Sequence, residues 1–374
     1  GKGSGNVATN TAFGIDALKL NTTGQFNVAN GTDALYSNTT GSNNTANGYQ
    51  ALSDNTTGNY NTATGYQALV RNTTSNYNTA TGYQALYINK HGNCNTSNGY
   101  QALYYSSGNN NVANGFEALY NNRSGNNNVA NGYRALKNNT YGEGNVANGY
   151  QALKLNTTGN FNTANGYTAL YENTTGNYNT ANGYRALYEN TTGNYNTANG
   201  YAALINNTIG VYNTANGYAA LSKNTTGVYN TANGYNSGYN NQTTDHNTFI
   251  GARADLDSLG ANWTESTALG YSAKITASNQ IMLGRSTETV VIPGNLNVNS
   301  LTVSNGLTMR ASITQSTITS LLTQLGDNID GEATSDQFGY SVSLSADGSI
   351  VAIGANNNNS GTGHVRVYQR DSTK

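Results

Sequence analysis

The stretch that decides the fold lies at residues 179–187 and reads N-T-A-N-G-Y-R-A-L. Its glycine recurs along the chain at Gly14, Gly31, Gly48, Gly65, Gly82, Gly99, Gly115, Gly132, Gly149, Gly166, Gly183, Gly200, Gly217 and Gly234. Every interval between these glycines is seventeen residues, except the interval of sixteen between Gly99 and Gly115. A fixed period in this range is the signature of a solenoid, in which each repeat forms one turn and stacks on the last.

Equivalent positions of successive repeats form columns, which we name after their residue in the reference repeat, residues 179–195. The Asn179 column holds Asn in every repeat, and the Leu187 column holds Leu in every repeat through Leu221. Like side chains form ladders when successive turns lie at the strand spacing of about 4.8 Å. We therefore predict an all-β fold, a parallel β-solenoid or β-roll with a 17-residue turn. Ala181 and Leu187 should face inward, and the Asn179 amide should bond main-chain groups at a bend and its equivalents in neighbouring turns.

Within each turn, residues 178–182 alternate and are rich in Tyr and Thr, which favours a strand. Residues 184–189 fit either a second short strand or a single helical turn. We favour two strands per turn, because Asn, Thr and Gly disfavour helices. The one-residue deletion falls within residues 104–108, and length changes in solenoids occur at corners. The N-T-T-G segment at residues 190–193 is therefore predicted to form the outer corner.

The composition excludes several classes of protein. With 44 Gly and only 36% hydrophobic residues the chain is not an ordinary globular one, and 29 Tyr with a net charge of -1 argue against disorder. Only 9% of the residues are charged, so no basic stripe can follow a phosphate backbone and nucleic acid is not expected as a partner. No apolar run approaches the roughly 20 residues of a membrane span. The single cysteine, Cys94, stands in the Tyr195 column and is expected to be a packed thiol.

From residue 247 the repeat becomes more apolar, as in N-T-F-I-G at residues 247–251, T-A-L-G at 267–270 and I-M-L-G at 281–284. Here the chain resembles, at motif level, the head domains of YadA-like trimeric autotransporter adhesins. It is also similar to the repeat regions of phage and large-virus fibres, where turns of the T-A-x-G-Y-x-A-L type recur. The resemblance covers about residues 6–294. It implies a homotrimer of β-rolls on a virion or cell surface, outside the cell, with host attachment through a cell-surface glycan or protein receptor.

Four segments are predicted. Residues 1–246 form the regular solenoid, and residues 247–294 form degenerate, more apolar turns. Residues 295–324 alternate apolar and polar without a turn period, and we predict a stalk or connector in which three chains share one core. Residues 325–374 contain three alternating, strand-like stretches and resemble a single blade of an FG-GAP propeller of the integrin α type. Because a propeller closes only with several blades, we expect the natural chain to continue beyond this blade.

The apolar interior of each turn is small, since it consists of Ala181, Ala186 and Leu187 or their equivalents. Ordering the backbone costs about 1 to 2 kcal/mol per residue, and three modest apolar side chains offset little of that cost over a whole turn. We therefore expect the solenoid to bury a further face against copies of itself. The resemblance makes that assembly a trimer.

Residues capable of chemistry are scattered. His91, His246 and His364 have no Cys, His or carboxylate partner at ligand spacing, so no metal, cofactor or catalytic residue is proposed. Glu172 and Glu189 occupy equivalent positions of adjacent turns. A glycosidase needs a facing pair of carboxylates, so a solvated face is the simpler interpretation of these two residues.

Asn-x-Ser/Thr sequences recur at the corners, and in a chain so rich in Asn and Thr many arise by chance. We expect these residues to build the corner, with N-glycosylation as the alternative in a cell that has the machinery. The candidate acceptors are Asn21, Asn38, Asn55, Asn72, Asn122, Asn156, Asn173, Asn190 and Asn224.

The predicted function is a structural and adhesive fibre shaft, not an enzyme, that holds a distal binding module away from a virion or cell surface. Two alternatives stay open: a polysaccharide-degrading enzyme of the tailspike type and an ice-binding solenoid. A cleft with paired carboxylates would favour the enzyme, and a flat exposed Thr face would favour ice binding. A threefold bundle with neither feature would favour the fibre.

Overall fold

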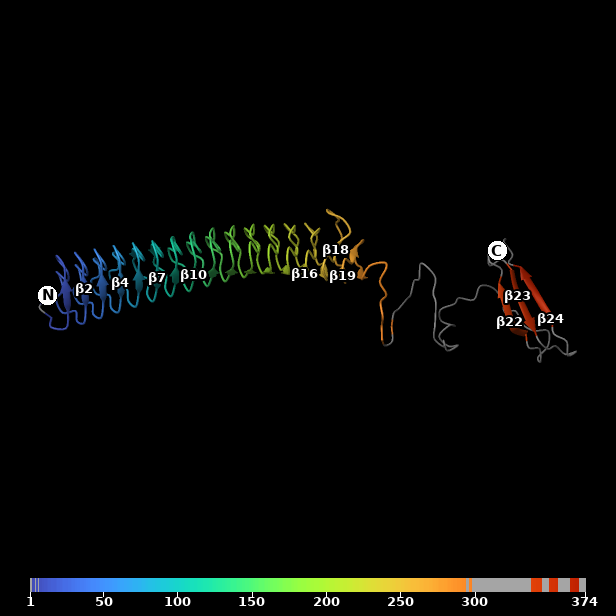
Figure 1. Ribbon diagram of the computed structural model, residues 1–374, viewed down its shortest axis with the longest axis horizontal. Coiled ribbons are helices and arrows are strands. Elements are labelled where there is room, and N and C mark those ends of the chain that lie inside the picture. The colour runs from blue at the N-terminus through green and yellow to red at the C-terminus, as the bar shows by residue number, and fades with distance from the viewer. Residues whose placement is uncertain are drawn as a thin grey trace. The chain divides into compact units, whose positions relative to one another are not determined.

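The computed structural model describes residues 2–3, 5, 7–293, 296–297, 338–344, 350–355 and 364–369. The chain forms two compact units, Gly1–Pro293 and Gly294–Lys374, and each is considered by itself. The first unit is a parallel β-solenoid whose coils stack along one axis, with their strands side by side along the stack (Figure 1). No α-helix occurs among the described residues.

The solenoid is built on one sheet of 17 short parallel strands, one from each coil. These strands are β1 (Thr11–Phe13), β2 (Val28–Asn30), β3 (Thr45–Asn47), β4 (Thr62–Thr64), β5 (Thr79–Thr81), β7 (Thr96–Asn98), β9 (Val112–Asn114), β10 (Val129–Asn131), β11 (Val146–Asn148), β12 (Thr163–Asn165), β13 (Thr180–Asn182), β14 (Thr197–Asn199), β15 (Thr214–Asn216), β16 (Thr231–Asn233), β17 (Thr248–Ile250), β19 (Thr267–Leu269) and β21 (Ile281–Leu283). Neighbouring strands pair in register, so that Thr180 lies beside Thr197 and Ala181 beside Ala198. The predicted parallel β-solenoid with one turn per repeat is confirmed.

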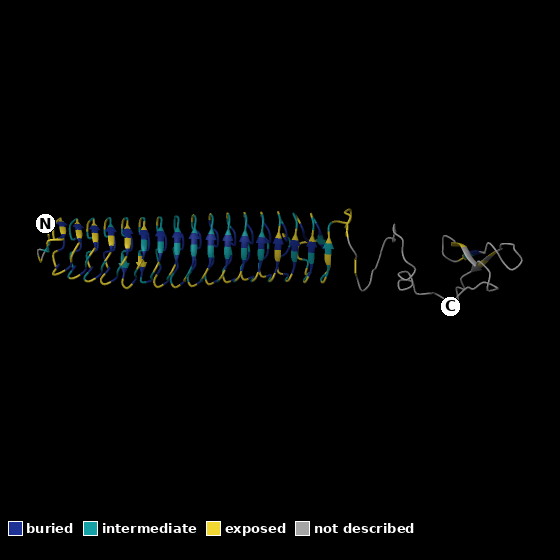
Figure 2. Ribbon diagram, turned by 90° about the horizontal axis from the view of Figure 1, so that it is seen from below, coloured by how far each residue is buried: buried dark blue, intermediate teal, exposed yellow. Residues whose placement is uncertain are grey.

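The alternation within each strand sorts its side chains between the two faces of the sheet. In β13, Ala181 points into the coil and is fully buried, whereas Thr180 and Asn182 point outward and are half-buried. Buried and partly exposed stretches recur at the same places from coil to coil along the stack (Figure 2). The Leu187 column is fully buried from Leu18 to Leu221. Both columns that were predicted to face inward therefore do so.

The second half of the coil differs from the prediction, because residues 184–189 form turns and not a second strand. Arg185 and Leu187 have positive φ angles of 54° and 51°. A strand requires negative φ at every residue, so no strand can run through these positions. The expectation of two strands per turn was wrong for the regular coils.

The backbone of this half alternates between closing a turn and joining the next coil. The amide of Ala186 donates to the carbonyl oxygen of Gly183 in the same coil at 3.5 Å, whereas the amide of Leu187 donates to that of Ala203 in the next coil at 3.0 Å. Among the described residues, short second strands form in two places. They are β6 (Ile88–Asn89) with β8 (Tyr105–Ser106), and β18 (Asp255–Leu256) with β20 (Lys274–Ile275).

Two features of the backbone require the motif glycine. Gly183 has a φ of 136°, a conformation that residues with a side chain rarely adopt. A Cβ atom on Gly183 would also lie 2.4 Å from the carbonyl oxygen of Gly200 in the next coil. A side chain at this position would therefore block the stacking of coils.

The interior changes where the regular repeat ends. Gly238 replaces the leucine of the Leu187 column, and Phe249 replaces the alanine of the Ala181 column one coil later. Phe249 is fully buried, and a Cβ atom on Gly238 would lie 2.8 Å from its ring. The Phe249 ring therefore occupies the space that the missing leucine leaves.

The second unit contains three strands, β22 (Phe338–Leu344), β23 (Ile350–Ala355) and β24 (His364–Gln369), which pair antiparallel in that order. The three strand-like stretches predicted in residues 325–374 are confirmed as strands, while their membership in an FG-GAP blade stays a prediction. The predicted stalk, residues 295–324, lies outside the described residues except for residues 296–297.

Candidate interaction surfaces

The Asn179 column lies inside the solenoid and ties successive coils together. Asn196 is fully buried, and its Nδ2 donates to the carbonyl oxygen of Gly210 at 2.8 Å. Its Oδ1 accepts a hydrogen bond from the backbone amide of Asn213 at 3.0 Å, one coil further on. The prediction that this amide serves the backbone and its neighbouring turns is confirmed.

The Asn190 column, which contains the candidate glycosylation acceptors, is also interior. Nδ2 of Asn190 donates to the carbonyl oxygen of Gly193 at 3.0 Å and to Oδ1 of Asn173 at 2.8 Å. All nine candidate acceptors are buried: Asn21, Asn38, Asn55, Asn72, Asn122, Asn156, Asn173, Asn190 and Asn224. A glycan would be attached to this same Nδ2 atom. Glycosylation of these residues stays a prediction, and it requires modification before the coil closes.

These two columns change the account of the interior. Counting Ala181, Ala186 and Leu187 alone omits two amide side chains per coil that are buried and hydrogen-bonded. Buried polar groups are stabilising when their hydrogen bonds are made, and stacked amide ladders add to the coil interface. The small apolar interior is therefore a weaker reason for oligomerisation than the sequence indicates.

The outer face of the sheet carries the Thr180 and Asn182 columns. From Asn114 to Asn216 the Asn182 column forms an unbroken ladder, in which each Nδ2 donates to Oδ1 of the next coil, as from Asn182 to Asn199 at 2.7 Å. The amides thus satisfy one another along the axis. From Asn114 to Asn216 the amide groups repeat with every coil, whereas the hydroxyl groups beside them are absent where valine replaces threonine, at Val112, Val129 and Val146.

Two aromatic columns border the strand in sequence, one on each side. The Tyr184 column stacks without a break from Tyr49 to Tyr235, with ring centroids 4.8 to 5.3 Å apart and interplanar angles of 4° to 18°. The Tyr195 column stacks in two stretches, from Tyr60 to Tyr77 and from Phe161 to His246. In such stacks the ring faces are covered by neighbouring rings, so the surface displays ring edges and hydroxyl groups.

Cys94 lies in the interruption between those two stretches, and its side chain is exposed. The expectation of a packed thiol was therefore wrong. The Tyr195 column lies on the outside of the coil, where even the stacked rings of Tyr60 and Tyr77 are 53% and 59% exposed. The neighbours of Cys94 in the column, Tyr77 and Asn110, are both exposed and leave the thiol exposed as well.

The outer face becomes apolar in the last coils of the solenoid. Ile250, Leu269 and Leu283 succeed one another in the Asn182 column and are 41%, 44% and 45% exposed. Ile281, in the Thr180 column, is 72% exposed. These four residues form an apolar strip, which we call the terminal strip, where the coils before it carry hydrogen-bonded amides.

Asp255 is a buried acidic residue that the sequence analysis missed. Its carboxylate accepts hydrogen bonds from the backbone amides of Asn240 and Leu256, both at 2.9 Å, and Nζ of Lys274 lies 3.6 Å away. Burial raises the pKa of Asp255 to about 6, and these three partners counteract only part of that effect. The signal was present, because Asp255 stands in the Leu187 column, where an acidic residue is out of place.

The other candidate residues of the solenoid lie on its lateral surface. Glu172 and Glu189 are half-buried in one column of adjacent coils, so they lie side by side along the stack. A glycosidase pair instead faces each other across a bound sugar. His246 ends the second aromatic ladder by stacking on Tyr229 at 5.0 Å, and His364 begins β24.

Comparison with known proteins gives no family model that matches this chain and no curated protein that matches it. Within the described part of the chain, no helix is both long and apolar enough to cross a bilayer. The resemblance to trimeric adhesin heads and virus fibres therefore stays a prediction, and the chain is characterised by its solenoid fold.

Proposed function

We propose that the solenoid is the rigid shaft of a structural and adhesive fibre that holds a distal binding module away from a virion or cell surface. The observation that carries this proposal is the continuity of the ladders along the axis. Backbone, amide and aromatic columns pass from coil to coil in register, as at Thr180, Asn196 and Tyr184. Each added coil lengthens such a rod by about 4.8 Å without changing its cross-section. Length is therefore the property that this repeat controls most directly.

We further propose that three chains form the fibre. The terminal strip supports this part of the proposal, since exposed apolar groups replace amides on the sheet just before residues 295–324. Ile250, Leu269 and Leu283 form one continuous line there. A monomer gains nothing from exposing such a line, whereas packing it against a second copy removes apolar surface from water.

Electron microscopy and mass measurement of the 374-residue chain test the proposal. We expect the mass of three chains and a straight rod. Deleting residues 166–199, which are two whole repeats, should shorten the rod by about 10 Å and leave the thermal transition cooperative. Deleting residues 166–190, which is not a whole number of repeats, should break the ladders and lower the transition temperature. A bent or flexible particle would contradict the shaft, and the mass of one chain would contradict the trimer.

Ice binding is a second candidate because the Thr180 column stands on the outer face of a regular sheet and not at a corner. Regular hydroxyl groups on a rigid face can match a lattice, although valine interrupts the column at Val28, Val112, Val129 and Val146. Thermal hysteresis of a freezing solution tests this candidate, with Thr180→Lys and Thr197→Lys as variants that disrupt the face. Absence of hysteresis in the unmodified protein would reject it.

A further inference from the structure

Within the regular array, residues 1–246, the single sixteen-residue interval falls between Gly65 and Gly132, and Arg71, Lys90 and Arg123 lie in the same stretch. Arg71 stands in the Glu189 column, whereas Lys90 and Arg123 replace threonine in the Thr191 column. The coil between those of Lys90 and Arg123, from Gly99 to Gly115, is shorter by one residue. The short strands β6 and β8 pair between this coil and the one before it. The substitutions, the shorter coil and the extra strands thus fall at one place on the lateral surface.

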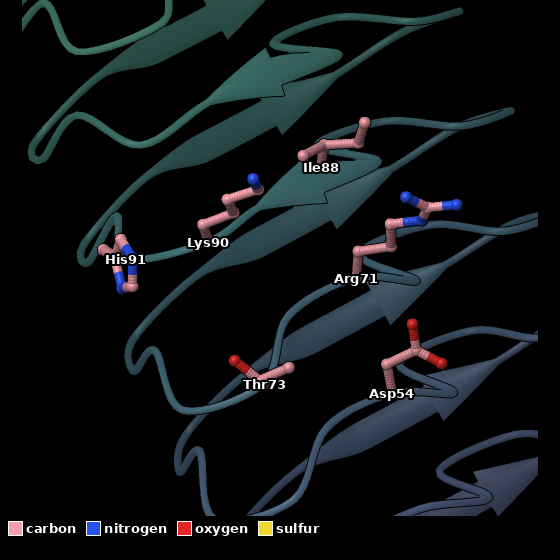
Figure 3. A pocket seen from close by; sticks show the side chains of 6 residues that line it. All are labelled: Asp54, Arg71, Thr73, Ile88, Lys90 and His91. Carbon is pink, nitrogen blue, oxygen red and sulfur yellow. The ribbon is translucent and has the colours of Figure 1, made fainter.

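Two adjoining hollows lie at this place. The first has a volume of about 420 Å³ and is lined by Asp54, Arg71, Thr73, Ile88, Lys90 and His91 (Figure 3). The second, of about 410 Å³, shares three of these residues and adds Tyr105, Ser106, Ser107 and Arg123. Figure 3 shows that the side chains of the first hollow project from successive coils. Because the second hollow shares Arg71, Ile88 and Lys90 with the first, the two together form a furrow across several coils.

The furrow carries an excess of positive charge. Arg71, Lys90 and Arg123 contribute three positive charges and Asp54 one negative charge, which leaves +2 with His91 neutral. The ion pairs found among the described residues involve other cations, including Arg134. Arg71 lies over the ring of Tyr87, with Cζ 5.8 Å from the ring centroid, and this contact leaves its charge without an acidic partner in an ion pair within the described coils. An anionic ligand could pair with all three cations.

Two further groups line the second hollow and lie outside the regular pattern of contacts. Ser106 replaces the asparagine of the Asn190 column, and its buried hydroxyl has no hydrogen-bond partner within the described structure. Tyr105 is 39% exposed and lies edge-on to Tyr104 and Tyr120, with interplanar angles of 73° and 86°. Rings within the stacks have both faces covered, whereas the perpendicular ring of Tyr105 is outside the stack. It can therefore offer its apolar surface to a ligand.

We propose that this furrow binds an acidic glycan, a polysaccharide chain carrying carboxylate or sulfate groups, along the fibre axis. Lys90 lies one coil and Arg123 three coils beyond Arg71, which is about 5 and 15 Å along the axis. Three cations over about 15 Å are few for nucleic acid, whose binding rests on many phosphate contacts. Carboxylate or sulfate groups carried on a chain of sugar rings suit both the cations and the ring of Tyr105.

This inference gives the proposed fibre a partner class and in that respect rests on the proposed function. It places adhesion on the shaft itself, in addition to any distal module. The furrow lies on the corner side of the coil, whereas the terminal strip lies on the sheet. Glycan binding and self-association therefore use different faces.

Binding is tested by calorimetric titration of the full chain with heparin-derived hexasaccharide, polygalacturonate hexamer and neutral maltohexaose. We expect the two acidic glycans to bind and the neutral one not to bind. The triple variant Arg71→Gln, Lys90→Gln, Arg123→Gln should weaken binding by about tenfold or more, as expected for loss of complementary charges. The matched control is Lys154→Gln, Arg185→Gln, Lys223→Gln, which removes the same charge elsewhere and should bind as the unmodified chain does.

A second variant separates sugar recognition from simple charge attraction. Tyr105→Ala should weaken binding of the glycans severalfold and leave the binding of inorganic polyphosphate unchanged. Equal loss in the control triple variant would overturn the site, as would free sulfate or an oligoaspartate peptide that binds as tightly as the glycans. A straight rod that does not bind glycans would reject the furrow and keep the shaft, whereas a flexible chain that binds them would reject the shaft and keep the furrow.

Discussion

The regular coils and the last coils of the solenoid fill the same cross-section in different ways. In a regular coil, alanine in the strand packs beside leucine from the turns, and both are fully buried. At the end of the regular array, Gly238 replaces the leucine and Phe249 replaces the alanine, so the large side chain comes from the strand and the small residue from the turns. The outer face changes there from amides to the apolar terminal strip. The comparison teaches that interior volume is held nearly constant while the surface is free to change. Stacking therefore constrains the side chains inside each coil, whereas partners contact the side chains on the outer surface.

The largest effect is expected where a coil meets its neighbour through backbone alone. Gly183→Ala places a Cβ atom 2.4 Å from the carbonyl oxygen of Gly200 and forces alanine into a φ of 136°. We expect a loss of about 4 kcal/mol or more, measured by chemical denaturation. Gly260→Ala is the control, since a Cβ atom there meets no atom within 4 Å. Equal losses in the two variants would show that backbone conformation, and not coil stacking, sets the requirement.

The replacement of leucine by Gly238 and of alanine by Phe249, which we call the exchange, is tested by reversing both substitutions. Phe249→Ala should cost about 3 kcal/mol because it leaves a cavity in the core. Gly238→Leu alone should also destabilise, since its side chain would collide with the Phe249 ring. The double variant restores the pattern of a regular coil, where Leu221 already adopts a φ of 48°. It should be more stable than either single variant in thermal denaturation, and simple additivity of the two losses would refute the exchange.

The buried amides of the regular coils are expected to contribute somewhat less per residue. Asn196→Leu would leave the carbonyl oxygen of Gly210 and the amide of Asn213 without their partner. We expect a loss of about 2 to 3 kcal/mol in the free energy of unfolding. Arg185→Leu, at a partly exposed position of the preceding coil, should change it by about 0.5 kcal/mol or less. If both substitutions lower the transition temperature alike, the Asn179 column contributes nothing specific.

The smallest effect concerns Asp255, which distinguishes the last coils by its response to pH. Its folded pKa of about 6 lies above the usual value of 3.8, so the folded state binds the proton more tightly than the unfolded state does. This contribution to stability is fully present well below the unfolded pKa of 3.8, where it amounts to about 3 kcal/mol, and it is lost as the pH rises through about 6, with about 2 kcal/mol of it lost between pH 4 and pH 7.

The measurement is the free energy of unfolding between pH 4 and pH 7 for the unmodified chain and for Asp255→Asn. The substitution should flatten the pH dependence, because an amide does not titrate in this range. Glu189→Gln, on the lateral surface of a regular coil, serves as the control. A pH dependence that survives in Asp255→Asn would assign it to other groups.

Much of the fold is predictable because the repeat period can be read from the sequence without knowledge of the backbone conformation. The inward columns at Ala181 and Leu187 and the role of Asn196 follow from invariance within one chain. The turn half was not predictable in the same way. Propensity favours negative φ for leucine, whereas closing a seventeen-residue coil places Leu187 at a φ of 51°. A requirement of the whole coil overrides the preference of the single residue.

The candidate sites were harder to predict, because burial in a solenoid depends on which side of a corner a residue occupies. Asn190 belongs to an acceptor motif and a corner motif at once, and only the structure places its amide inside. The basic furrow escaped detection because Arg71, Lys90 and Arg123 are far apart in the sequence and few in number. Their common feature is the side of the coil on which they lie, which becomes visible when the coils are stacked.

The hydrogen bonds between coils, such as that from Leu187 to Ala203, have a mechanical consequence. Tension along the axis pulls on the bonds of one interface together, so force builds until a whole coil detaches. A detached coil of seventeen residues extends to roughly 60 Å, whereas it occupied about 5 Å in the stack. Under load the rod would lengthen in uniform steps of about 55 Å, and each step would dissipate work before the next coil yields. A stiff shaft of this design would also dissipate mechanical work on stretching, and the total work would grow with the number of repeats.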